Sequence, residues 1–154
     1  MSDHDKLGIT LTDVPTGSIS SVKVSHEHPV TSVSVPTYCH ALRGATIAPI
    51  NTADCIYAAT RELLQLLVTK NDIAPNAIAS AFFTVTPDLN AAFPAKAARQ
   101  LGWQHVALLC ATEIAVPNAL GNCIRVLLHF NADQPRSQYQ SIYVHGAEGL
   151  LVED

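Results

Sequence analysis

The sequence is short of charged residues. Only 14% of its 154 residues are Asp, Glu, Lys or Arg, against about 25% in an average soluble domain. Aromatic residues are also few, at 6%, whereas apolar residues make up 48%. A chain with so little charge for its apolar content favours burial of part of its surface in an oligomer.

The charges that are present exclude two classes of partner. Nine Lys and Arg against thirteen Asp and Glu give a net charge of −4, so the chain lacks the basic field of a nucleic-acid-binding protein. No apolar run approaches the roughly 20 residues that span a bilayer. The first residues, MSDHDKLGIT, do not resemble a secretory signal. We therefore expect a single cytoplasmic domain with neither nucleic-acid nor membrane partners.

Metal-binding, disulfide and nucleophile motifs are also missing. The four cysteines contain no CxxC pair, which is typical of free thiols in a reducing compartment. Of the seven histidines only His26 and His28 lie close together, and this spacing does not supply the roughly four ligands of a zinc site. The sequence has no GxSxG motif and no Gly-rich phosphate loop. We predict no metal site.

Residues 1–38 differ in composition from the rest of the chain. They are rich in Ser, Thr, Val and His, contain no Arg, and are interrupted by several prolines. We interpret them as an N-terminal extension, flexible or packed on the surface, in which residues 31–35 favour an edge strand. The folded domain is expected to cover residues 39–154.

From residue 39 the apolar pattern predicts a mixed α/β or α+β domain. Thr52 is expected to cap a helix that runs to about Lys70. Pro75 is expected to start a short helical turn, and Pro94 is expected to start a helix over 95–101. The first strand is expected to stop at Gly44. Strands are predicted at residues 38–43, 80–86, 105–111, 122–130 and 141–144. The expected fold is a mixed sheet of about five strands with two main helices on one face.

The segment NCIRVLLHF (122–130) carries the most informative charge. Alternation places its apolar residues from Ile124 to Phe130 on a core face and Arg125 on the other face. Burying a lone charge costs several kcal/mol, so Arg125 needs a partner. Two interpretations stay open on this segment alone: a salt bridge at a sheet rim or between subunits, and an anion receptor on a rigid strand.

Other cations favour the second interpretation. Arg43 lies near a strand end, and Lys96 and Arg99 lie three apart on one face of a helix start. Cations beside a helix start favour a carboxylate or a phosphate, whereas their spacing alone favours a solvated helix face. Glu113 follows an apolar strand, a position that is typical of a solvated loop carboxylate, and the sequence has no evident nucleophile–base pair. This set of cations with few acid–base groups favours binding of a small polyanion, or catalysis by electrostatics alone.

Several of these residues fall in a recognisable pattern. The segments LRGAT (42–46), TPDLNAAFPAKAARQLGWQ (86–104), LLCATE (108–113) and NCIRV (122–126), followed by Tyr143, resemble in order and spacing the AroH-class chorismate mutases. This is the β-rich, homotrimeric class of that enzyme. The resemblance covers residues from about 40 to about 146 and leaves the extension outside.

The resemblance implies a homotrimer with a pseudo α/β-barrel core, outer helices, and active sites between subunits. It implies conversion of the dianion chorismate to prephenate by a Claisen-type [3,3] rearrangement, in the biosynthesis of phenylalanine and tyrosine. Such an enzyme needs no metal and no cofactor. It holds the substrate in a compact shape and stabilises the negative charge that grows on the ether oxygen.

The resemblance also implies roles for individual residues. Arg125 matches the cation beside the breaking ether bond, and Arg43 with Tyr143 matches the pair that binds a carboxylate. Glu113 and Cys110 match the residues that hold the ring hydroxyl, Cys110 partly through its backbone. The remaining matches line the mouth of the cleft or close it: Phe93, Ala95, Lys96, Arg99 and Leu150. Leu151 stands where the family often has a basic residue, which implies weaker closure by the tail.

Two alternatives remain. One is a trimer like the enamine/imine deaminases, which also hold a carboxylate with an intersubunit Arg. The other is a non-catalytic trimer, either anion-binding or structural, in which Arg125 and Arg43 make intersubunit salt bridges. Convergence of Arg125, Arg43 and Glu113 on one cleft would discriminate against a purely structural role.

Overall fold

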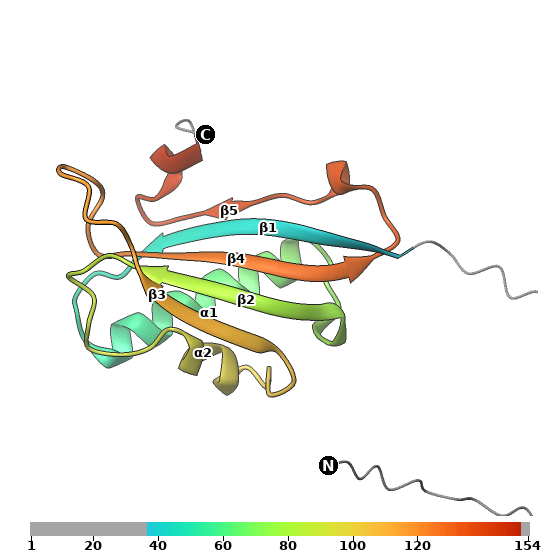
Figure 1. Cartoon of the computed structure of the whole chain (residues 1–154), viewed down its shortest axis with the longest axis horizontal. Helices are drawn as coiled ribbons and strands as arrows, with labels where there is room; N and C mark the ends of the chain where they lie inside the picture. Colours follow the sequence, from blue (N-terminus) through green and yellow to red (C-terminus); the bar gives the residue numbers. More distant parts are fainter. Residues whose placement is uncertain (1–36, 152–154) are drawn as a thin grey trace, which may run out of the picture. The chain divides into compact units, whose positions relative to one another are not determined.

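The computed structural model describes residues 37–151. A single sheet has the spatial order β3-β2-β4-β1-β5 (Figure 1). Strand β4 is antiparallel to β1 and to β2, whereas β3 is parallel to β2 and β5 is parallel to β1. The strands are β1 (Tyr38–Ile47), β2 (Ile78–Val85), β3 (Ala107–Thr112), β4 (Cys123–Ala132) and β5 (Ile142–Tyr143). The predicted mixed sheet of five strands is confirmed, with shifted ends.

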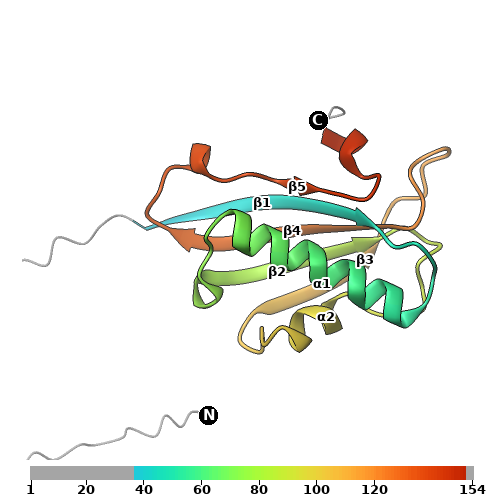
Figure 2. The ribbon, with the colours of Figure 1, turned by 180° about the vertical axis from the view of Figure 1, so that it is seen from behind.

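Two α-helices cover one face of this sheet, as Figure 2 shows from behind. Helix α1 (Ala53–Lys70) begins after Thr52, whose side-chain oxygen accepts from the backbone N–H of Cys55 at 3.3 Å. Helix α2 (Ala95–Gln100) begins after Pro94. Both predicted starts are confirmed. Neither of these, nor any other helix within residues 37–151, is long and apolar enough to cross a membrane.

Three short 3₁₀ turns complete the described elements. The turn η1 (Pro75–Ala77) confirms the helical turn predicted at Pro75. The turn η2 (Arg136–Gln138) interrupts the connection from β4 to β5. The turn η3 (Glu148–Leu151) lies in the segment after β5, residues 144–151, here called the tail. The tail passes over the end of β1 and the start of β4, where Ala147 and Leu150 pack against Ala45 and Cys123.

The predicted alternation along β4 is confirmed. Ile124, Val126, Leu128 and Phe130 are buried on the helix-covered side, at 0–3% exposure. Arg125 lies on the opposite side, as predicted. Cys123 shares that side but is fully buried as well, because the tail residue Ala147 packs over it.

The predicted strand end at Gly44 is wrong. Strand β1 continues through Gly44 to Ile47, and Gly44 pairs with Val126 of β4. A Cβ at Gly44 would lie 2.9 Å from Cδ1 of Leu67 and 3.1 Å from Cδ1 of Leu63, both on α1. The glycine therefore lets α1 approach the sheet closely, and does not break the strand.

The other side of the sheet, here called the uncovered face, carries large apolar side chains that no α-helix within residues 37–151 covers (Figure 2). Phe82, Leu109 and Leu127 occupy one row across β2, β3 and β4, and they are 46%, 54% and 37% exposed. An exposed apolar row of this kind is typical of a surface that associates with another molecule. The predicted extension over 1–38, with its expected edge strand, lies outside the described residues except at its end, where Tyr38 begins β1.

Candidate active site

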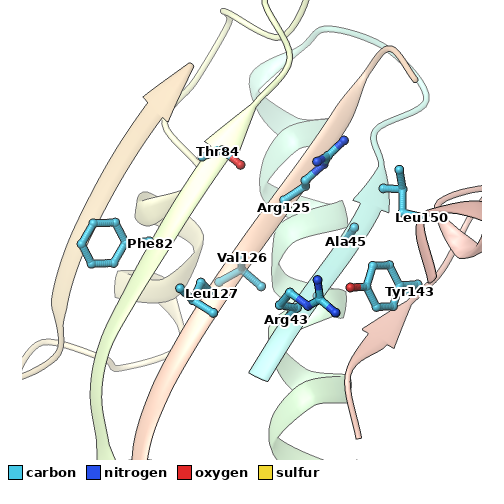
Figure 3. A pocket seen from close by; sticks show the side chains of 10 residues that line it. Arg43, Ala45, Phe82, Thr84, Arg125, Val126, Leu127, Tyr143 and Leu150 are labelled. Atoms are coloured by element: carbon cyan, nitrogen blue, oxygen red, sulfur yellow. The ribbon is translucent and has the colours of Figure 1, made fainter. Parts of the chain in front are cut away.

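A pocket with a volume of about 380 Å³ opens on the uncovered face, between β2, β4, β1 and the tail (Figure 3). This size suits a small organic ligand. The lining combines two arginines with hydroxyl and apolar side chains: Arg43, Gly44, Ala45, Phe82, Thr84, Arg125, Val126, Leu127, Tyr143 and Leu150.

The two arginines reach the pocket from adjacent strands. Ala45 of β1 pairs with Arg125 of β4, so Arg43 lies one step of alternation away on the same face. Tyr143 of β5 pairs with Ala45, and Figure 3 shows its hydroxyl turned toward the guanidinium of Arg43. Two fixed positive charges in one partly apolar pocket favour a ligand that carries negative charges.

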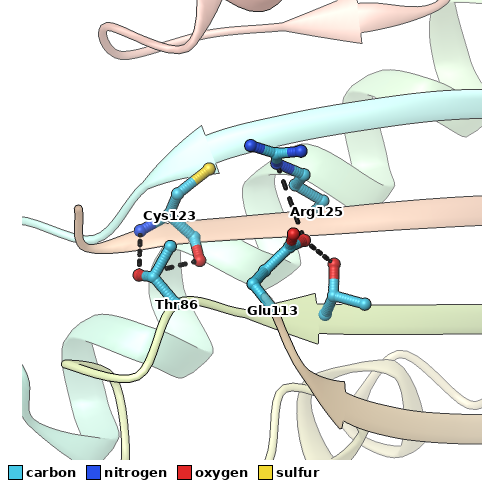
Figure 4. Close-up of polar contacts among 5 residues, drawn as sticks. Thr86, Glu113, Cys123 and Arg125 are labelled. Carbon is cyan, nitrogen blue, oxygen red and sulfur yellow. Dashed lines mark hydrogen bonds and ion pairs between the residues drawn. The ribbon is translucent and has the colours of Figure 1, made fainter. Parts of the chain in front are cut away.

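Arg125 meets one carboxylate of its own chain. Its Nε lies 3.6 Å from Oε1 of Glu113, and the two side chains are 40% and 18% exposed. The backbone N–H of Glu113 donates to the carbonyl oxygen of Val85 at 2.8 Å, and the hydroxyl of Thr84 donates to Oε1. Figure 4 shows the contact between Glu113 and Arg125. The ion pair involves one edge of the guanidinium, and Arg125 also lines the pocket.

Two of the three residues whose convergence was in question, Arg43 and Arg125, line one pocket. Glu113 does not line it but contacts Arg125. A purely structural salt bridge does not need a second arginine in the same pocket. The arrangement fits the anion receptor better than the rim salt bridge.

The backbone around Arg125 is held by a polar cluster at the start of β4. Cys123 and Thr86 bond reciprocally. The N–H of Cys123 donates to Oγ1 of Thr86 at 2.9 Å (Figure 4), and the N–H of Thr86 donates to the carbonyl oxygen of Cys123 at 3.0 Å. Hydrogen bonds from Thr86 and from the backbone N–H of Asn122 hold the pKa of Asp88 below its ordinary value, although desolvation opposes them.

Burial keeps the nearby thiols neutral. It raises the pKa of Cys123, although a hydrogen bond with Arg125 and the charge of Arg125 oppose this shift. Burial also raises the pKa of Cys110, although the backbone of Ala95 opposes it. A neutral thiol is a poor nucleophile. Nucleophilic catalysis by either cysteine is therefore not favoured.

The side chain of Cys110 points away from the pocket. Cys110 pairs with the buried Phe83 and packs against the core on the helix-covered side. Its neighbour Leu109 lies on the uncovered face instead. Contact of Cys110 with a ligand through its backbone stays a prediction.

Four predicted cleft residues do not line the pocket: Phe93, Ala95, Lys96 and Arg99, here called the α2 group. Phe93 is 75% exposed just before α2. Nζ of Lys96 lies 5.2 Å from the ring centroid of Tyr57 on α1, a cation–π distance. The α2 group belongs to the helix layer and the pocket to the uncovered face, so one chain does not bring the two together.

Arg99 has partners within its own chain. Its Nη1 donates to the backbone carbonyl of Trp103. The same nitrogen donates to the carbonyls of Gln104 at 3.0 Å and of Val106 at 3.1 Å. These bonds tie the end of α2 to the loop that leads into β3. They give Arg99 a structural role, and its predicted contact with substrate stays a prediction.

Six residues that line the pocket were not predicted from the sequence, and three of them have large or polar side chains on the uncovered face. Thr84, Phe82 and Leu127 all project onto the uncovered face. Alternation along the strand SAFFTVT puts Phe82 and Thr84 on one side. The sequence contains no signal for the register that sets Thr84 opposite Arg125, because that pairing depends on how β2 and β4 meet. Among residues 37–151, no three His, Cys, Asp or Glu side chains gather closely enough to hold a metal ion.

The family match, the curated relatives and the solved structure described below are all chorismate mutases. The family described as chorismate mutase type I matches residues 39–153. A curated relative, chorismate mutase AroH of Thermus thermophilus, is 43% identical over 110 residues, which cover 71% of this chain and 90% of the relative. Chorismate mutase AroH of Bacillus subtilis is 38% identical over 104 residues, or 67% of this chain and 82% of the relative. A solved chorismate mutase from Clostridium thermocellum has a TM-score of 0.70 and 47% identity, covering 71% of this chain and 98% of its own.

Proposed function

We propose that the pocket beside Arg125 is the substrate site of this chain, which belongs to the chorismate mutase type I family. The chain is accordingly an isomerase of aromatic amino acid biosynthesis that converts chorismate to prephenate. The observation that supports this site is the pair of arginines that two adjacent strands bring into one partly apolar pocket. Chorismate carries two carboxylates and an ether oxygen, which are the groups that such a pocket would attract.

The proposed mechanism is electrostatic. The guanidinium of Arg125 stabilises the negative charge that grows on the ether oxygen as the C–O bond breaks. Arg43 and Tyr143 bind a carboxylate, and Glu113 accepts a hydrogen bond from the ring hydroxyl. The reaction is unimolecular, so the walls of the pocket, which include Leu150 of the tail, contribute by holding the substrate compact. No proton transfer and no covalent intermediate is required.

We further propose that the site is completed between subunits of a homotrimer. The α2 group does not line the pocket of its own chain, and Phe93 is largely exposed. The apolar row of the uncovered face would be covered by a neighbouring sheet. In such an assembly Phe93, Ala95 and Lys96 of one subunit would meet Arg125 of the next.

Subunit mixing tests this arrangement. Arg125→Ala and Lys96→Glu chains are each expected to be strongly impaired, because the first removes the central cation and the second repels a dianion. Both variants are unfolded together and refolded at equal concentrations. A site is then intact when its Arg125 comes from the Lys96→Glu chain and its Lys96 comes from the Arg125→Ala chain. Random assembly makes about a quarter of all sites intact, so about a quarter of the activity of the unchanged protein should return.

Lys70→Glu serves as the matched control, since Lys70 ends α1 and lies outside both the pocket and the α2 group. That variant should retain full activity. No recovery in the mixture, while each variant refolds alone to the assembly of the unchanged protein, would contradict a shared site and indicate that each chain acts by itself.

We propose that residues 39–154 are the catalytic domain and that the extension is not needed for chemistry. The family match begins at residue 39, and the pocket is lined by residues 43–150. Removal of residues 1–36 is expected to leave kcat and KM within about twofold, because it deletes no proposed site residue. Steady-state kinetics with chorismate, with prephenate identified as product, measure this. A tenfold loss of kcat would show that the extension contributes to the site.

The cytoplasmic location of the protein stays a prediction.

A further inference from the structure

Thr84 lies next to Arg125 in the row of paired strand residues beneath the pocket. It pairs with Ala111 on β3 and with Arg125 on β4, and Arg125 pairs in turn with Ala45 on β1. The small side chains of Ala111 and Ala45 flank this row. Strand β2 therefore places the hydroxyl-bearing Thr84 directly opposite Arg125, and Thr84 itself lines the pocket.

The hydroxyl has a defined partner. It donates to Oε1 of Glu113, the same oxygen that lies 3.6 Å from Nε of Arg125. A hydroxyl has one proton to donate and an ionised carboxylate can only accept. Together with the bond from Glu113 N–H to the Val85 carbonyl, these contacts hold Glu113 at its backbone and at one carboxylate oxygen. Both side-chain contacts fall on Oε1, so Oε2 is the oxygen that remains to accept from a ligand.

We propose that Thr84 is a positioning residue for the rearrangement: it locks the carboxylate of Glu113 beside Arg125 so that Oε2 accepts from the ring hydroxyl of the substrate. This inference rests on the proposed function, in which Glu113 binds that hydroxyl. Thr84 acts through Glu113. An aligned acceptor matters because a small misplacement of a binding group lowers the rate of a reaction that depends on substrate shape.

A structural explanation for Thr84 makes a different prediction. A β-branched residue suits a strand, and valine would meet that need equally well. If only the shape of residue 84 matters, Thr84→Val should behave like the unchanged protein and Thr84→Ser should be the poorer variant. If the hydroxyl positions Glu113, the order is reversed.

The experiment compares Thr84→Val and Thr84→Ser by steady-state kinetics with chorismate in the full-length assembled enzyme. We expect kcat of Thr84→Val to fall about tenfold, as loss of a hydrogen bond to a charged group would produce, with KM changed less than threefold. Thr84→Ser should stay within twofold. Thr69→Val is the matched control: Thr69 donates to the Gln65 carbonyl on α1, outside the pocket, and this variant should retain full activity.

A double-mutant cycle separates positioning from stability. In a Glu113→Ala background the hydroxyl has no carboxylate to hold, so adding Thr84→Val should lower kcat no further. A further tenfold loss in that background, or full activity of Thr84→Val alone, would overturn the proposal for Thr84 while leaving the proposed function intact. Full activity of Glu113→Ala would instead overturn the role of Glu113 in the proposed function, and the role of Thr84 with it.

Discussion

Replacement of Arg125 by alanine is expected to lower kcat by at least about 10³-fold, the largest loss from any single substitution in this chain. Arg125 is the cation that the proposed mechanism sets against the developing charge on the ether oxygen. Interactions of this kind are stronger in the transition state than in the ground state, so their loss appears in kcat rather than in KM alone. One such donor contributes roughly 3–4 kcal/mol, and a guanidinium offers several.

The variant is expected to fold and assemble. Arg125 is 40% exposed, and removing it frees the 18%-exposed carboxylate of Glu113, which Thr84 still binds. Far-UV circular dichroism and light scattering measure fold and mass, and chorismate consumption measures turnover. Arg136→Ala is a matched control, because Arg136 of η2 donates to the carbonyl of Tyr139, just after that turn, and does not line the pocket.

Arg125→Lys separates charge from shape. Lysine keeps the positive charge but cannot present the planar set of donors, so we expect kcat to remain at least tenfold below that of the unchanged protein. Turnover in Arg125→Ala within tenfold of the unchanged protein would contradict the assignment of Arg125. Equal activity in Arg125→Lys would leave charge as its sole contribution.

Replacement of Phe83 by alanine is expected to reduce the free energy of unfolding by about 3–5 kcal/mol. Phe83 is 1% exposed and packs within the core between the sheet and the helices. Truncation of so large a buried side chain removes its transfer free energy and leaves a cavity that close-packed neighbours fill only in part. Chemical denaturation followed by circular dichroism measures the change.

Its neighbour Phe82 provides a matched substitution on the other face. Phe82→Ala removes the same side chain from the same strand, where it is 46% exposed. Since the uncovered face is proposed to pack against another subunit, we expect weaker association, so that the unfolding midpoint of this variant depends more steeply on protein concentration. Equal losses of stability at every concentration in both variants would contradict the distinction between the two faces.

Much of this protein could be predicted from its sequence, because local chemistry determines those features. Thr52 can cap a helix wherever that helix packs, and the alternation from Ile124 to Phe130 requires one buried face. The order of the motifs around Arg43, Cys110 and Arg125 was sufficient to predict the family, and the comparisons confirm it. Each of these features depends on spacing along the chain.

Tertiary structure decided the features that depend on the pairing of distant segments. Gly44 resembles a strand end in the sequence, yet it lies within β1 because Leu63 and Leu67 of α1 approach it there. Thr84 carries no local signal, and only the register between β2 and β4 sets it opposite Arg125.

The α2 group shows the same division between sequence and structure. The family motif predicts that Lys96 and Arg99 share a cleft with Arg125, whereas the fold of one chain puts them in a different layer from the pocket. Residue types and spacing determined which chemistry the chain can carry, because those are local properties. Which side chains meet depends on strand register and layer packing, because contacts between residues far apart in sequence form only when the chain folds.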